Sequence, residues 1–333
     1  MALDPTLPVL DPSTPLTPGH PTRWGRVLRW VAAAGYVTWF VHSYRVGGFP
    51  FDRERVLAWI AAGLLVTAIG HPARRYVLVL LDWFPFAVLL YFYDSSRGWA
   101  DDFGRPVLVG ALVRADRLLF FGQVPAAWLQ PRLRTVGAGV GWWELGVSIV
   151  YASHFVLPFV LAGVLWWRSR RLWRQWVNRF LVLSFSAVLT YAAVPAAPPW
   201  YAAQVGLLPP IDRPVQQGWT RIGFYAAPAW FARGQDVANA FAALPSMHAG
   251  YSALVALYLF RLAGHGRWRW LLFAYPLAMA FTLVYAGEHY VVDILAGWLY
   301  VVVTVAVCDR MGRRWQARTR FRLGPTRSPV PAG

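Results

Sequence analysis

The sequence predicts an all-α polytopic membrane protein with about eight transmembrane helices. Hydrophobic residues make up 57% of the 333 residues and charged residues only 14%, whereas a soluble domain carries about 25% charged residues. Apolar stretches of nearly 20 residues recur, and this is the length that crosses a bilayer as a helix. Arginines form short clusters between these stretches, as the positive-inside rule expects.

The candidate spans follow one another with two long interruptions, one after the third span and one after the fifth. The first two spans are short. In order, we expect spans near residues 27–42, 56–70, 76–93, 142–167, 176–194, 245–262, 268–287 and 289–307.

We expect a single membrane-embedded catalytic domain, residues 23–309, with its catalytic motifs in residues 195–309. Residues 1–22 are rich in Pro, Ser, Thr and Asp and lack the apolar core of a signal peptide, so they predict a disordered tail. Residues 310–333 contain a run of arginines and predict a basic cytoplasmic tail. The lone cysteine, Cys308, excludes an intrachain disulfide and a cysteine-based metal cluster.

The charge distribution indicates a membrane topology rather than a nucleic-acid partner. The formal net charge is +17, and every basic residue is an arginine. A basic protein can bind nucleic acid, but these arginines lie in short loops beside apolar runs. Eight crossings place most short-loop arginines on the side of both chain ends, so the termini are expected to be cytoplasmic. The long loops, residues 94–141 and 195–244, then face outward together with the active site.

Two histidines stand at the starts of predicted spans, both on the outward side. Pro245 and Ser246 precede His248, and this order is typical of a capped helix start whose N–H groups suit a phosphate. Asp293 follows His289 by four residues, so the two side chains share one helix face.

This constellation predicts phosphoryl chemistry. A carboxylate at Asp293 can accept the proton of one ring nitrogen of His289 and raise the basicity of the other. Such an imidazole can attack phosphorus, and His248 can protonate the departing oxygen. No metal or cofactor is required. The alternative is that these residues are satisfied polar groups that pack helices together, but the Pro-Ser-x-His segment at the same membrane face favours chemistry.

Several further residues are candidates for substrate binding. A polar cluster after the third span could bind phosphate through its arginines and sugar or inositol hydroxyls through its carboxylates, or it could be a solvated loop. Glu288 could contact an acceptor hydroxyl or only solvent. A histidine at mid-span, His154, is functional by default, although a bond to a neighbouring helix would also explain it. The cluster comprises Asp94, Arg97, Asp101, Asp102 and Arg105, and weaker phosphate candidates are Arg213, Arg221 and Arg233. Asp82 is expected to pair with Arg74 or Arg75.

The sequence resembles the type-2 phosphatidic acid phosphatase superfamily, mainly over residues 142–309. Pro245, Ser246 and His248 match its Pro-Ser-x-His motif, and His289 and Asp293 match the end of its third motif, followed by Leu295-Ala296-Gly297. The resemblance implies a six-helix catalytic core in which His289 is the nucleophile, His248 the acid and Asp293 the residue that orients the nucleophile.

Two departures from the family pattern point to one branch. Leu283 stands where the third motif has arginine, and the first motif is not met, because Arg97 and Arg105-Pro106 have seven residues between them. Fungal inositol-phosphorylceramide synthase and the sphingomyelin synthases keep the two histidines and the aspartate without the full arginine motifs. The chain is similar to that branch, also in residues 197–201, Ala-Pro-Pro-Trp-Tyr.

The resemblance implies a phosphotransferase. It would move a phosphorylated headgroup, with inositol phosphate as one candidate, from a lipid donor to a hydroxyl acceptor through a phosphohistidine. The alternative is a phosphatase with the same site that acts on a lipid phosphate or a polyprenyl phosphate. A transporter or scaffold is less favoured, because the polar residues gather at one membrane face rather than along several spans.

Overall fold

The computed structural model describes residues 23–47, 53–71, 73–99, 104–134, 140–225, 229 and 239–323. The regular structure of these residues is helical, apart from isolated bridges that Ala196 forms with Leu108 and with Ala242. The expected all-α fold is confirmed. The tail expected at residues 1–22 lies outside the described residues. Residues 310–323, expected in the basic tail, continue the last helix.

Each expected span coincides with a helical segment. Local signals set some of the helix ends; for example, the side chain of Ser169 accepts a hydrogen bond from the Leu172 N–H at 3.4 Å and caps α7. The longer helices are α1 (Arg23–Gly47), α2 (Arg53–Ala68), α3 (Ala73–Trp99), α6 (Trp142–Arg168), α7 (Arg170–Ala193), α10 (Met247–Leu262), α11 (Ala274–Tyr285) and α12 (Val291–Leu323). The shorter ones are α4 (Gly110–Leu119), α5 (Pro125–Leu133), α8 (Pro199–Gln204), η2 (Pro214–Gln216), η3 (Gly218–Ile222) and η4 (Arg267–Phe273).

Four segments of the described chain are long and apolar enough to cross a membrane: Tyr76–Tyr93, Trp142–Arg168, Arg170–Ala193 and Val291–Arg314. The other expected spans are shorter or more polar. Helix α10 has 16 residues and α11 has 12, after the 3-10 turns of η4. Helix α1 is long enough, but it carries four arginines among its 25 residues.

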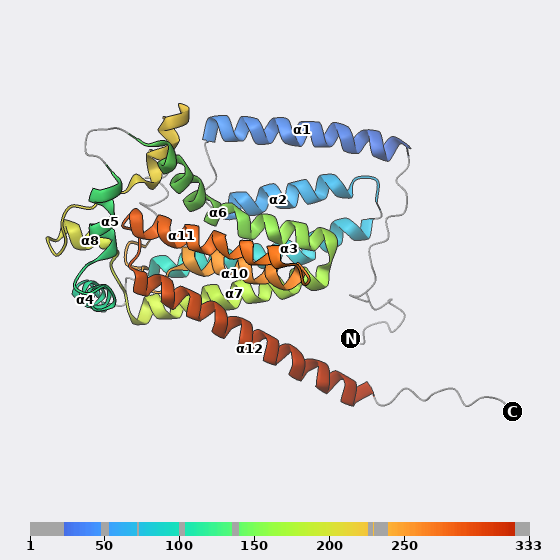
Figure 1. The fold of residues 1–333 in the computed structure, drawn as a ribbon. Coiled ribbons are helices and arrows are strands. Elements are labelled where there is room, and N and C mark those ends of the chain that lie inside the picture. Colours follow the sequence, from blue (N-terminus) through green and yellow to red (C-terminus); the bar gives the residue numbers. More distant parts are fainter. Residues whose placement is uncertain are drawn as a thin grey trace.

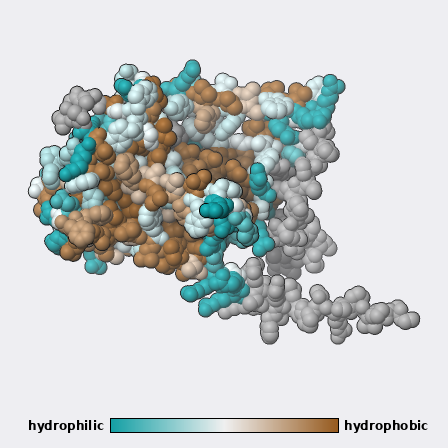
Figure 2. All heavy atoms as spheres, viewed as in Figure 1, coloured by the Kyte–Doolittle hydropathy of each residue, from teal (hydrophilic) through white to brown (hydrophobic). Residues whose placement is uncertain are grey.

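The outer surface of the long helices is apolar. Phe84 of α3, Leu189 of α7 and Val302 of α12 are 69%, 73% and 61% exposed, and Figure 2 shows hydrophobic residues over much of the visible face. An apolar surface of this extent needs a nonpolar surrounding. The chain is an integral membrane protein.

The helices form one bundle with α4, α5 and α8 gathered at one end. Figure 1 shows α4, α5 and α8 at the left, whereas α1 begins and α12 ends at the right, where α12 projects beyond the bundle. A large core cluster of buried residues joins α2, α3, α6, α7, α10 and α12.

Asp82 pairs with an arginine that the sequence did not suggest, and its expected pairing with Arg74 or Arg75 stays a prediction. Its carboxylate accepts two hydrogen bonds from Arg170, both at 2.6 Å, and one from Trp166 Nε1 at 2.8 Å. Arg170 begins α7 directly after the break at Ser169, and this turn brings its side chain onto α3. The side chains of Arg74 and Arg75 lie outside the described residues.

Candidate active site

The starts of α10 and α12 pack directly against each other. The backbone N–H of Ser246 donates to the Asp293 carbonyl at 3.0 Å. A Cβ at Gly297 would lie 2.4 Å from the Ser246 carbonyl oxygen, so only glycine allows this approach. The Ser246 side chain is fully buried and accepts from the Ala249 N–H at 3.3 Å, which caps α10. This serine has a structural role, and its contact with a phosphate stays a prediction.

The two histidines and the aspartate lie in a row. His289 Nε2 is 3.4 Å from His248 Nδ1, and His289 Nδ1 is 3.6 Å from Asp293 Oδ2. The second distance suits an ion pair and is slightly too long for a hydrogen bond. Asp293 is completely buried, and its Oδ2 also accepts the Tyr290 N–H at 2.9 Å. The structure thus brings together the three residues that the sequence singled out for chemistry.

The gap between the histidines is too small to hold a phosphate. A phosphorus atom must approach the attacking nitrogen to about 3–3.5 Å, and the His248 ring occupies that space, with its centroid 5.5 Å from that of His289. Binding of a substrate therefore requires one of the two rings to turn away.

Aromatic rings of α6 surround His248. The Tyr151 ring stacks on it at a centroid distance of 4.8 Å, the His154 ring lies at 4.0 Å, and Phe155 meets it edge-on at 6.0 Å. His154 is buried and also stacks on Tyr251 at 5.2 Å. The structure therefore places His154 at the site, against a histidine; a contact between His154 and substrate stays a prediction.

Glu288 and Arg213, both candidates for substrate contacts, pair with each other. The carboxylate of Glu288 accepts from Nε and Nη2 of Arg213, both at 2.9 Å. Arg221 lies elsewhere, with its guanidinium 4.8 Å from the centre of the Trp142 ring. Arg233 lies outside the described residues.

Most side chains of the polar cluster after the third span lie outside the described part of the structure. Asp101 and Asp102 lie outside the described residues, as do the side chains of Asp94 and Arg97 near the end of α3. Arg105 lies on an exposed segment before α4. Their proposed roles in substrate binding stay predictions.

Asp116 of α4 is a residue of the site that the sequence did not reveal. Its side chain is 1% exposed, and its two oxygens accept from the N–H groups of Val291 and Val292, both at 3.1 Å. The carboxylate therefore occupies two of the N–H groups at the start of α12. In the sequence Asp116 stands between two arginines in a short segment, a pattern typical of a solvent-exposed residue. Only the tertiary contact shows that it is buried.

Titration of Asp116 should leave a pH signature in stability. Burial raises the pKa of this carboxyl to about 6, although the two amide hydrogen bonds lower it. The raised pKa means that the folded protein binds the proton more tightly, so the contribution to stability is full below about pH 4 and is lost as the pH rises through about 6. The melting temperature of the wild type, measured relative to that of Asp116→Asn, should therefore fall as the pH rises through this range. A difference that stays constant from pH 4 to pH 7 would contradict the assignment.

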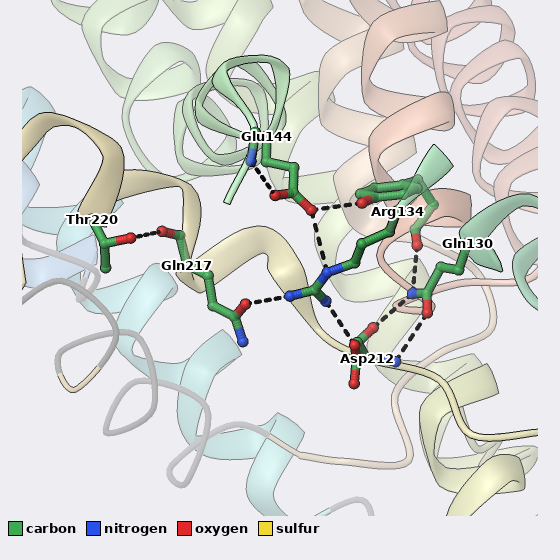
Figure 3. A network of polar contacts seen from close by, with 8 residues as sticks. Gln130, Arg134, Glu144, Asp212, Gln217 and Thr220 are labelled. Carbon is green, nitrogen blue, oxygen red and sulfur yellow. Dashed lines mark hydrogen bonds and ion pairs between the residues drawn. The ribbon is translucent and has the colours of Figure 1, made fainter. Parts of the chain in front are cut away.

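A polar network fixes the loop that carries Arg213 (Figure 3). The Gln130 amide donates to the carbonyls of Asp212 and Tyr285, both at 2.7 Å, and accepts from the Asp212 N–H at 3.0 Å. Arg134 donates to the Asp212 carboxylate at 2.8 Å and lies 3.6 Å from Glu144, which accepts the Tyr285 hydroxyl at 2.7 Å. Helices α5, α6 and α11 are thereby tied to the segment before η2.

Fold and site together define an integral membrane protein in which two histidines and an aspartate lie in a row where α10 and α12 begin. The model of the PAP2 superfamily matches residues 110–307, more than half of the chain. The chain belongs to the PAP2 superfamily, as the sequence resemblance predicted.

Three relatives carry related names. The chain is 25% identical over 256 residues to the inositol phosphorylceramide synthase catalytic subunit aur1 of Schizosaccharomyces pombe, a match that covers 74% of the chain and 57% of that protein. It is 28% identical over 249 residues to the phosphoinositol dihydroceramide synthase of Bacteroides thetaiotaomicron, covering 70% and 77%. It is 29% identical over 211 residues to the inositol phosphorylceramide synthase of Candida albicans, covering 58% and 40%. The chain thus spans little more than half of the fission-yeast protein. No solved structure matches it.

Proposed function

We propose that this protein transfers a phosphorylated headgroup, with phosphoinositol as the favoured one, from a lipid donor to the hydroxyl of a lipid acceptor. The observation that carries the proposal is the position of His289 between Asp293 and His248, with ring nitrogens toward both. The names of the relatives support transfer of phosphoinositol to a ceramide-like acceptor. They give no support for a polyprenyl-phosphate substrate.

The reaction would take place in two balanced steps. His289 Nε2 attacks phosphorus, the bond from phosphorus to the glycerolipid oxygen breaks, and that oxygen takes a proton from His248. The acceptor hydroxyl then attacks the phosphohistidine and gives its proton back to His248, which frees His289. Asp293 stabilises the imidazole of His289 as it gains positive charge. These steps need acid, base and nucleophile only, so we propose a metal-independent reaction.

Identification of the product tests this function. The purified protein is incubated with a glycerolipid labelled in its phosphoinositol group and with a ceramide acceptor. We expect the label to move to the ceramide, and expect omission of the acceptor to stop most turnover. Label that appears only as water-soluble inositol phosphate or phosphate, whether or not ceramide is present, would favour the phosphatase alternative.

The proposed topology has eight crossings, cytoplasmic termini and an outward active site. Its support is that α1 begins and α12 ends at the end of the bundle opposite α4, α5 and α8 (Figure 1). Two single-cysteine variants in a Cys308→Ala background test it: Tyr225→Cys, at a side chain 76% exposed, and Gly312→Cys, where a Cβ meets nothing within 4 Å. An impermeant thiol reagent should label the first from outside intact cells and the second only after permeabilisation. Labelling of both from outside would refute the topology.

A further inference from the structure

Arg213, in a long loop, is held on two sides. Glu288 grips its fork with two hydrogen bonds at 2.9 Å. The Trp200 ring lies under the guanidinium, 4.5 Å from its central carbon. The backbone of Trp200 is itself tied to the site, because its N–H donates to the Gly287 carbonyl at 3.1 Å.

The backbone that carries Arg213 is fixed against the segment before His289. Gly287 has a positive φ of 64°, and a Cβ there would lie 2.3 Å from Ile211 Cγ2, so residues 211 and 287 are in direct contact. Gln130 binds Asp212 through both backbone groups. An arginine mounted in this way keeps its position without help from a ligand.

Two neighbours link Arg213 to the segments that carry the histidines. Its partner Glu288 immediately precedes His289 in the chain. Arg213 also interacts electrostatically with Tyr151, whose ring stacks on His248. Burial opposes the charge of the guanidinium, but Glu288 outweighs this effect, and the pKa of Arg213 is raised. A permanent cation is thus linked, through Glu288 and Tyr151, to the segments that carry the reacting groups.

We infer that Arg213 binds a non-bridging oxygen of the transferred phosphate and that Glu288, its ion-pair partner, makes the site select a phosphodiester over a phosphomonoester. The inference rests on the proposed function and deepens it. The pair with Glu288 uses two of the five N–H hydrogens of a guanidinium, so the same fork can bind a carboxylate and a phosphate oxygen. Arg213 would then take the place of the arginine that Leu283 replaces in the family motif.

The balance of charge supports the selection. Three carboxylates lie around the start of α12: Glu288 pairs with Arg213, Asp293 lies 3.6 Å from His289, and Asp116 binds the N–H groups of Val291 and Val292. A phosphomonoester carries a charge of about −1.5 to −2 at pH 7, because its second pKa is about 6, whereas a phosphodiester carries one negative charge. Since Glu288 already neutralises Arg213, the additional charge of a monoester meets net repulsion. A purely structural ion pair would show no such preference.

Two lipids that differ in one charge test the inference: short-chain phosphatidic acid, a monoester, and short-chain phosphatidylmethanol, its methyl diester. Calorimetry measures their binding to the detergent-solubilised protein at pH 7.5. The wild type should bind the diester about tenfold more tightly, the scale of one screened charge contact. Glu288→Gln should bring the ratio of the two affinities close to one, because the variant binds the monoester more tightly.

Substitutions of the arginine separate a ligand-binding role from a structural one. Arg213→Ala should weaken the binding of both lipids by at least about tenfold. Arg213→Lys keeps the charge but not the forked guanidinium, and should lose less affinity. The control is Arg221→Ala, at an exposed arginine of the same loop region, which should bind like the wild type. Melting temperatures show which variants are folded.

Three results would overturn the inference: unchanged affinities in Arg213→Ala, an unchanged ratio in Glu288→Gln, or no binding of either lipid to the wild type. If Glu288→Gln fails to fold, the wild type at pH 5 tests the selection by charge itself, because phosphatidic acid then carries about one charge and the ratio should approach one. Binding does not depend on turnover, so failure of the proposed reaction, seen as an active His289→Ala, remains a separate outcome.

Discussion

Replacing His289 with alanine should abolish turnover. The variant loses the nitrogen that attacks phosphorus, so no covalent intermediate can form. Ring contacts with His248 are lost as well, but Asp293 keeps its hydrogen bond from the Tyr290 N–H, and the start of α12 stays capped by Asp116. The loss should therefore appear in activity and not in folding. Product formation with a labelled phosphoinositol lipid and a ceramide measures it.

Trapping the intermediate makes this prediction specific. In the absence of an acceptor, wild-type protein denatured at neutral pH should carry label from the donor phosphate, and His289→Ala should carry none. His265→Ala is a suitable control, because His265 is an exposed histidine in the turn between α10 and η4. Appreciable turnover by His289→Ala, in a preparation as stable as the wild type, would remove the phosphohistidine from the mechanism.

The residues that could be predicted from the sequence are those that local geometry brings together. Asp293 follows His289 by one helical turn, and the helix itself puts the two side chains on one face. Pro245 and Ser246 are also a local signal, because they predict the start of α10 from adjacent residues alone. The proximity of His248 to His289 followed from two helix starts assigned to one membrane face, a coarse argument that needed no knowledge of packing.

The contacts that the sequence did not reveal join distant segments. Asp116 caps a helix that begins 175 residues later, and Arg213 reaches a glutamate 75 residues away. Glu288 was expected to face substrate or solvent because no residue near it in the sequence suggests an ion-pair partner. The same limitation explains Asp82, whose partner Arg170 lies on another helix, 88 residues away.

Fold class and helix positions could be predicted because hydrophobicity alone sets them, but the number of spans could not. Helix α1 carries four arginines and a histidine, and α10 and α11 are shorter than a bilayer requires. Whether such helices cross depends on what they pack against. Helix α10 packs against α6, α7, α11 and α12, and these neighbours cover its polar start.

His248→Ala should slow turnover by about 10²–10⁴-fold, the usual scale for loss of a general acid. The defect should depend on the leaving group, because His248 is proposed to protonate the oxygen that departs. A donor with the same phosphoinositol group but a nitrophenolate leaving group needs no protonation, so His248→Ala should recover much of its rate in the first step. His289→Ala should recover none, since its defect precedes any departure. The rate of nitrophenolate release from both variants measures this asymmetry.

The rescue distinguishes the acid from a residue that only packs against the nucleophile. His248 is enclosed by Tyr151, His154 and Phe155, so its removal leaves a space that could displace His289. A displaced nucleophile would slow reaction with every donor alike, whereas a missing acid slows only donors with a basic leaving group. His154→Phe, which retains a ring beside His248, controls for packing and should show no dependence on the leaving group. Equal defects of His248→Ala with both donors would show that His248 positions the nucleophile and does not transfer the proton.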